Sequence, residues 1–105
     1  MNKKKFGSTM RKGFHMTFEN GLTISVQWGA GNYCDNYNSG DFTCRTDAHS
    51  NTAEIAVMYG REFIPIDPFV PEHCSHDGTV CGWMSPEDVL YAMNKVREFV
   101  PNHNN

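Results

Sequence analysis

The sequence predicts an α+β fold, in which an antiparallel sheet of about four strands, arranged as two hairpins, carries one C-terminal helix on one face. Three observations support this prediction. Two pairs of segments alternate apolar and polar residues around turn sequences, one C-terminal segment has helical apolar spacing, and 105 residues suffice for a single core. We expect one domain over residues 13–100, with a basic flexible tail at 1–12 and a flexible tail at 101–105.

The first predicted hairpin joins residues 14–18 to residues 22–28. The second of these segments reads LTISVQW, so its apolar side chains point to one face and its polar side chains to the other. Asn20-Gly21 between the segments accepts the positive φ angles of a tight turn. The pattern predicts two strands that share one buried face.

The second predicted hairpin joins residues 53–59 to residues 62–66 through Gly60-Arg61. Pro65 cannot donate a ladder hydrogen bond, so we expect the last strand to end there or to lie at an edge. Residues 79–83 could add a short strand after a polar loop at 73–78.

The predicted helix covers residues 86–100. Ser85 is a favourable N-cap, Pro86 suits the first turn, and Glu87 and Asp88 favour the positive end of the helix dipole. Pro101 ends the helix. The apolar positions expected to face the sheet are Val89, Met93, Val96 and Val100.

The charge distribution is uneven, although the net charge is only −3. Five of the nine basic residues lie in the first twelve positions, whereas residues 13–105 hold four basic and twelve acidic residues, a balance of −8. Such a body repels a phosphate backbone, so we expect no nucleic-acid polymer as partner. No run approaches the roughly 18 apolar residues of a membrane span, and no signal peptide is visible, which predicts a cytoplasmic protein without membrane contact.

One cluster of potential metal ligands stands out: His73, Cys74, His76 and Cys81. These are residue types that Zn²⁺ accepts, but their spacing matches no standard finger, and two adjacent ligands are poorly placed to coordinate together. Cys34 and Cys44 could supply a further pair. We expect free thiols and loop histidines, with no metal and no cofactor, and keep the metal site as the alternative.

Catalytic signatures are missing from the sequence. It has no nucleophile elbow, P-loop, H-E-x-x-H or complete dinucleotide-binding glycine pattern. We therefore expect a protein that is not an enzyme.

The aperiodic stretch at 29–52 is the strongest candidate for a binding loop. Unstructured segments longer than about 12–15 residues are usually functional or disordered, so a mobile insertion is the alternative. Aromatic side chains could stack on a flat ring, and asparagine or aspartate could contact hydroxyls and base edges. Arginines or the amides of Gly29–Gly31 could hold phosphate, unless the arginines pair with neighbouring carboxylates. The predicted ligand-binding residues are Trp28, Asn32, Tyr33, Asp35, Tyr37, Arg45 and Arg61.

Three strings, GLTISVQWGAGNYCDNY, NTAEIAVMYG and VCGWMSPEDVLYAMNKV, occur in this order between Phe14 and Phe99. Together they resemble small proteins encoded by tailed bacteriophages, a group without an assigned activity. GNYCDN is the most recognisable part of the resemblance. The resemblance implies expression in the cytoplasm of the host cell, where small phage proteins often disarm host defence.

We therefore expect a phage anti-defence protein that binds and sequesters a small nucleotide-type immune signal without cleaving it, as a homo-oligomer. The alternative is an acidic inhibitor that binds a host defence protein, because an acidic body suits a basic partner surface. A third possibility is a structural module stabilised by metal.

Overall fold

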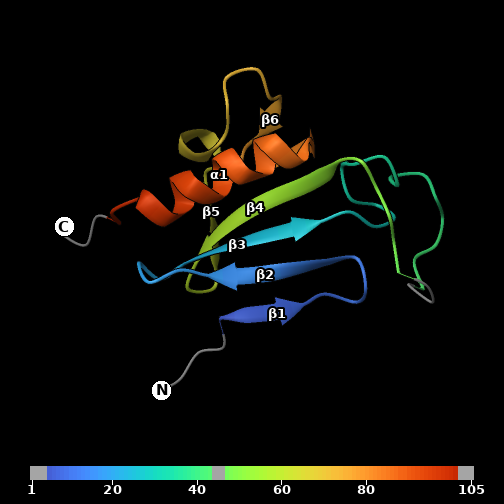
Figure 1. Cartoon of the computed structure of the whole chain (residues 1–105), viewed down its shortest axis with the longest axis horizontal. Helices are drawn as coiled ribbons and strands as arrows, with labels where there is room; N and C mark the ends of the chain where they lie inside the picture. Colours follow the sequence, from blue (N-terminus) through green and yellow to red (C-terminus); the bar gives the residue numbers. More distant parts are fainter. Residues whose placement is uncertain (1–4, 44–46, 102–105) are drawn as a thin grey trace.

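The computed structural model describes residues 5–43 and 47–101. It confirms an α+β architecture, in which an antiparallel sheet carries one C-terminal helix across one face (Figure 1). Within the described residues the strands are β1 (Phe6–Ser8), β2 (Gly13–Thr17), β3 (Leu22–Gln27), β4 (Ala53–Tyr59), β5 (Glu62–Ile64), β6 (His76–Asp77) and β7 (Val80–Met84); a short 3₁₀ helix, η1 (Asp67–Phe69), and the helix α1 (Pro86–Glu98) complete the fold.

The sheet has seven strands in the described part of the chain, more than the four expected. Their order is β1-β2-β3-β4-β7-β6, and β5 also pairs with β4. Both predicted hairpins are present, as β2–β3 and β4–β5. One edge of β4 is shared, because Ala53 to Ala56 pair with β7 whereas Val57 to Tyr59 pair with β5.

Strands β1 and β6 were not predicted. Phe6 pairs with Met16 and Ser8 with Phe14, so the sheet begins inside the 1–12 segment that we expected to be a flexible tail, and the boundary at residue 13 is corrected. Both strands are short, exposed and without alternation. Both strands form because they pair with a neighbouring strand, and the local residue pattern does not predict that pairing.

The hydrophobic core lies between the sheet and α1. Alternate residues of the two central strands are buried on the helix side, as the period of two predicts for β3. Phe69 of η1 closes one side of this core, and Ala92 and Val96 are the buried residues of α1. The buried strand residues are Leu22, Ile24, Val26, Ile55 and Val57.

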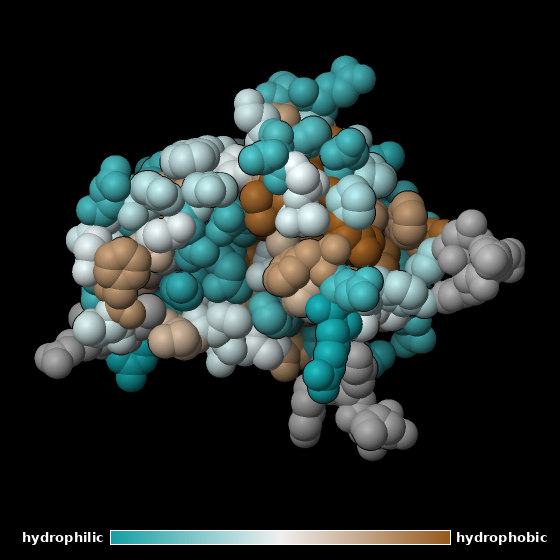
Figure 2. Space-filling view, turned by 180° about the vertical axis from the view of Figure 1, so that it is seen from behind, coloured by the Kyte–Doolittle hydropathy of each residue, from teal (hydrophilic) through white to brown (hydrophobic). Residues whose placement is uncertain are grey.

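On the other face, β3 carries the polar residues Thr23, Ser25 and Gln27, whereas β4 carries Glu54, Ala56 and Met58. The hydroxyls of Thr17 and Thr23 lie 2.7 Å apart, and Thr9 donates a hydrogen bond to Gln27 (3.0 Å). The side of the molecule opposite to that of Figure 1 is largely hydrophilic, with hydrophobic residues gathered in patches (Figure 2). Among the described residues, no helix is long and apolar enough to cross a membrane.

The ends of α1 are fixed by side chains. Ser85 accepts a hydrogen bond from the backbone amide of Asp88, and Asp88 accepts one from the backbone amide of Ser85, which forms a capping box. At the other end, Asn20 of the β2–β3 turn donates to the carbonyls of Val96 (2.7 Å) and Phe99 (2.8 Å). The helix ends before Val100, which is 82% exposed, so its predicted inward orientation is wrong.

We predict that Ser85→Ala lowers the free energy of unfolding by about 0.5–2 kcal/mol, because it removes the N-cap acceptor. Chemical denaturation followed by circular dichroism measures the change. Ser39→Ala, in an exposed part of the loop, is the matched control and is expected to change stability by under about 0.5 kcal/mol. Equal effects of the two substitutions would contradict the capping role.

Candidate functional site

Trp83 on β7 is the centre of the candidate site. The pairing of β7 with β4 shifts by one residue between the pairs Ala53–Met84 and Ile55–Cys81, so β7 contains a bulge. Trp83 has φ of +48°, a backbone region that residues other than glycine rarely adopt, and it is 55% exposed. Bulges redirect side chains and backbone strain concentrates at functional sites, so an exposed, strained tryptophan is a candidate binding residue.

Tyr33 of the 29–52 loop packs directly on this bulge. The amide of Trp83 donates to the carbonyl of Tyr33 over 2.8 Å. A Cβ atom on Gly82 would lie 2.4 Å from Tyr33 Cβ and 2.7 Å from its carbonyl oxygen, closer than real contacts allow. Glycine at position 82 therefore permits the loop backbone to approach β7.

Tyr33, Tyr37 and Trp83 form a partly exposed cluster, which we call the aromatic platform. Tyr33 and Trp83 are stacked, with ring centroids 5.7 Å apart and planes 12° from parallel. Tyr37 lies 5.7 Å from Tyr33 and 6.3 Å from Trp83, in tilted geometry. All three side chains are more than 40% exposed, so the platform presents aromatic surface to solvent.

The loop that carries the two tyrosines is held by its own hydrogen bonds. The amide of Gly31 donates to the carbonyl of Tyr37, and the amide of Tyr37 donates to the carbonyl of Cys34, whose side chain is buried. The side chain of Asn36 donates to the carbonyls of Trp28 (2.8 Å) and His49 (2.9 Å). These contacts hold the part of the loop that carries the two tyrosines against itself and against the end of β3.

A pocket of about 560 Å³ adjoins the platform. Its volume falls within the range of small-molecule sites. None of the described residues that line it is Lys or Arg, and Asp77 and Asp88 give it acidic character. The lining residues are Tyr33, His73, Cys74, Ser75, His76, Asp77, Val80, Gly82, Trp83 and Asp88.

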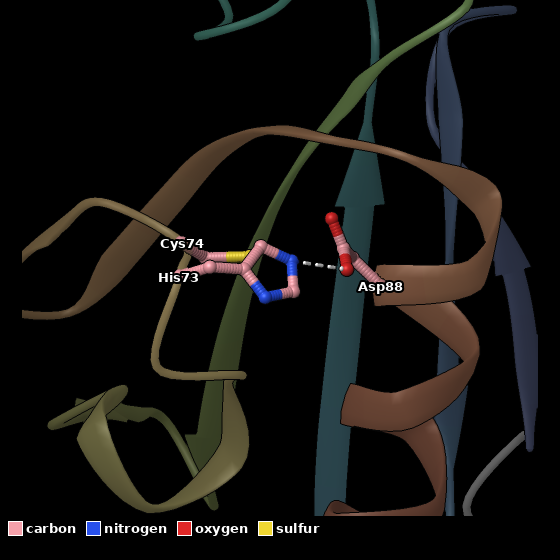
Figure 3. A group of neighbouring side chains, drawn as sticks. All are labelled: His73, Cys74 and Asp88. Carbon is pink, nitrogen blue, oxygen red and sulfur yellow. Dashed lines mark hydrogen bonds and ion pairs between the residues drawn. The ribbon is translucent and has the colours of Figure 1, made fainter.

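Three polar side chains converge on one wall of this pocket. His73 and Cys74 extend from the segment before β6 toward Asp88 in the first turn of α1 (Figure 3). His73 Nε2 lies 2.9 Å from Asp88 Oδ1, and the donor atoms of all three residues lie within 4.8 Å of one another. His73 and Cys74 are adjacent in sequence, yet their side chains lie on the same side of the chain and both reach Asp88.

Burial and charge set the protonation of these groups. Burial, together with the negative charge of Asp88, raises the pKa of Cys74 to about 12, and burial also raises the pKa values of Cys34 and Cys81. Burial alone would raise the pKa of Asp88, but hydrogen bonds from His73 and Ser85 lower it below its usual value. At neutral pH these three thiols are protonated and Asp88 is ionised.

The structure separates the predicted ligand-binding residues. Tyr33 and Tyr37 lie together in the aromatic platform. Asn32 accepts from the amide of Gly29 (2.9 Å) and donates to Glu54 (2.9 Å), so its side chain holds the loop.

Asp35 also has a local contact, since it accepts from the hydroxyl of Thr52 over 2.8 Å. Trp28 donates to the carbonyl of Ala48 (2.9 Å) and lines a separate apolar hollow beside α1. These residues lie outside the pocket beside the platform.

Arg61 does not join the aromatic platform. Arg61 lies in the β4–β5 turn, at the end of β4 away from the loop (Figure 1), and lines another surface hollow with Lys5 and His15. Arg45 lies outside the described residues.

Sequence reasoning missed Trp83, His73 and Asp88 as members of one site. Gly82 before Trp83 was a usable signal, because glycine inside a strand often marks a bulge or a close backbone approach. His73 and Asp88 are 15 residues apart, and the packing of η1 against α1 brings them together.

Comparison with protein-family models, curated proteins and solved structures finds no significant match to this chain. Function is therefore inferred from the geometry of the site.

Proposed function

We propose that this protein binds and holds a small nucleotide-type ligand, without cleaving it, by stacking the ligand's ring against the aromatic platform. The observation that carries the proposal is the exposed Trp83, held at positive φ and stacked on Tyr33 at the rim of the pocket. Stacking of a base on an aromatic side chain contributes about 1–3 kcal/mol and requires no particular base.

The polar wall of the pocket supports recognition of a base or sugar. His73, Ser75 and Asp77 line the same space and offer donors and acceptors for ring edges and hydroxyls. Because the described lining includes no Lys or Arg, we infer that the ring end of the ligand enters the pocket and that its phosphates face solvent.

The biological role that we propose is sequestration of a nucleotide immune signal in the host cytoplasm. The expectation from the sequence that this is a phage protein, which stays a prediction, motivates this role. Homo-oligomerisation stays a prediction, which size-exclusion chromatography with light scattering tests.

Calorimetry with a panel of cyclic oligonucleotides and ADP-ribose-derived signals tests the proposal. We predict that one ligand binds and that Trp83→Ala weakens its affinity about 5- to 150-fold, the range that corresponds to the loss of one stacking contact. Trp83→Phe retains a ring and is expected to recover most of the affinity.

Arg61→Ala is the control, since Arg61 lies at the other end of β4. We expect it to leave the affinity unchanged. The proposal fails if no panel member gives heat at high micromolar concentration. Loss of binding in Arg61→Ala but not in Trp83→Ala would instead place the ligand in the basic hollow beside β1.

A second candidate function is inhibition of a host defence protein with a basic surface. The acidic balance of residues 13–105 and the carboxylates of Asp77 and Asp88 in the same pocket favour it. If this function holds, the protein binds one host protein, and added salt weakens that binding. Replacement of the exposed residues Glu72 and Asp77 by Lys is expected to abolish it. Capture that is insensitive to salt and to charge reversal would contradict it.

A further inference from the structure

The cluster of His73, Cys74 and Asp88 contains the three donor types that Zn²⁺ takes in proteins: imidazole nitrogen, sulfur and carboxylate oxygen. The donor atoms lie within 4.8 Å of one another. Zn–N and Zn–O bonds near 2.0–2.1 Å and Zn–S bonds near 2.3 Å place neighbouring atoms of a tetrahedral site roughly 3.3–3.8 Å apart. Shifts of about 1 Å or less bring the three atoms to these separations.

Two of the three side chains are held before any ion binds. Asp88 is fixed by the capping box of α1, and its side chain is only 18% exposed. Cys74 packs against the core, and its amide donates to the carbonyl of Pro71. The His73 side chain is 70% exposed, so its ring can rotate toward an ion. Its contact with Asp88 already brings two of the three ligand side chains together. The chain therefore needs little reorganisation to close on an ion.

The surroundings also suit an ion. The cluster lines the 560 Å³ pocket, which gives access from solvent and leaves room for a fourth, exchangeable ligand. Binding of the ion displaces the proton of the Cys74 thiol to solvent, and the resulting thiolate and the Asp88 carboxylate carry two negative charges, which a divalent ion neutralises. The lining includes no described Lys or Arg that would repel the ion.

We infer that His73, Cys74 and Asp88 bind one zinc-type transition-metal ion, with the fourth position open to the pocket. This inference goes beyond the proposed function and does not depend on it.

Metal titration of the full chain tests the inference. The protein is stripped with a chelator, kept reduced, and titrated with Co²⁺ and then Zn²⁺ without any nucleotide. We expect one equivalent of Co²⁺ to bind with a thiolate-to-cobalt charge-transfer band and intense visible bands, and Zn²⁺ to remove both. Zn²⁺ is also expected to raise the thermal unfolding temperature.

Variants assign the ligands. Cys74→Ser is expected to abolish the charge-transfer band, and His73→Gln to weaken Zn²⁺ affinity at least tenfold. Because His73 is exposed, we expect His73→Gln to fold. Its Zn²⁺ affinity therefore tests the metal site even if Cys74→Ser does not fold. Cys34→Ser changes a buried thiol outside the cluster and is expected to retain the band.

The inference is overturned if the protein binds no stoichiometric metal, if the band persists in Cys74→Ser, or if His73→Gln binds Zn²⁺ as tightly as the unmodified chain. Since no nucleotide is present, failure here leaves the result for the aromatic platform unaffected. The two proposals are thus tested separately.

Discussion

Phe69→Ala is expected to lower the free energy of unfolding by about 3–5 kcal/mol, the range found when a buried phenylalanine is truncated in a core. Phe69 is 1% exposed, and its ring meets Phe99 edge-on with centroids 5.1 Å apart. Its removal leaves a cavity between η1 and α1. For a chain of 105 residues this is a large share of a stability that is typically about 5–15 kcal/mol.

The effect also reaches the candidate site. η1 leads into the segment that carries His73 and Cys74, so loosening its contact with α1 moves both away from Asp88. Denaturant unfolding followed by circular dichroism gives the change in free energy. Phe63→Ala removes the same ring from a position that is 57% exposed and is expected to cost under about 1 kcal/mol. Similar losses for the two variants would show that Phe69 does not anchor this side of the core.

Gly82→Ala is expected to destabilise the protein by about 1–3 kcal/mol, as overpacking does, and to displace Tyr33 from Trp83. The added Cβ would meet backbone and Cβ atoms of Tyr33 at 2.4–2.7 Å, where no flexible side-chain end can move aside. We therefore expect loss of the stacked pair, which near-ultraviolet circular dichroism detects, and weaker ligand binding.

Gly7→Ala is the matched control for this prediction. Gly7 also lies in a strand, and a Cβ there meets nothing within 4 Å. We expect it to change stability by under about 0.5 kcal/mol and to leave the aromatic signal intact. A neutral Gly82→Ala would mean that the loop does not depend on close approach to β7.

The regular part of the fold was predictable because each element has a local signal. Alternation in residues 22–28 marks β3, and Ser85 with Asp88 forms the capping box that starts α1. The extra strands were not predictable, since β1 and β6 are exposed, lack alternation and exist through pairing with a neighbour. Val100 continues the helical spacing of apolar residues, but α1 ends at Glu98. Helical spacing therefore does not predict the direction of the Val100 side chain, which is exposed.

The candidate site was predictable only in part. Aromatic residues in an aperiodic loop indicated Tyr33 and Tyr37, but their partner Trp83 is presented by a bulge whose register depends on pairing with β4. Arg61 could have been excluded from the loop site: β4 has seven residues, so its two ends lie roughly 20 Å apart. The loop precedes β4 and Arg61 follows it.

Native mass spectrometry of the protein purified from bacterial cells with an active nucleotide-signalled defence tests the central proposal most directly. We predict a bound species heavier by the mass of a small nucleotide, which is released intact on denaturation and is missing from Trp83→Ala purified in parallel. A protein that emerges without a nucleotide, or that carries the same nucleotide in Trp83→Ala, would contradict the proposal that the aromatic platform holds the ligand.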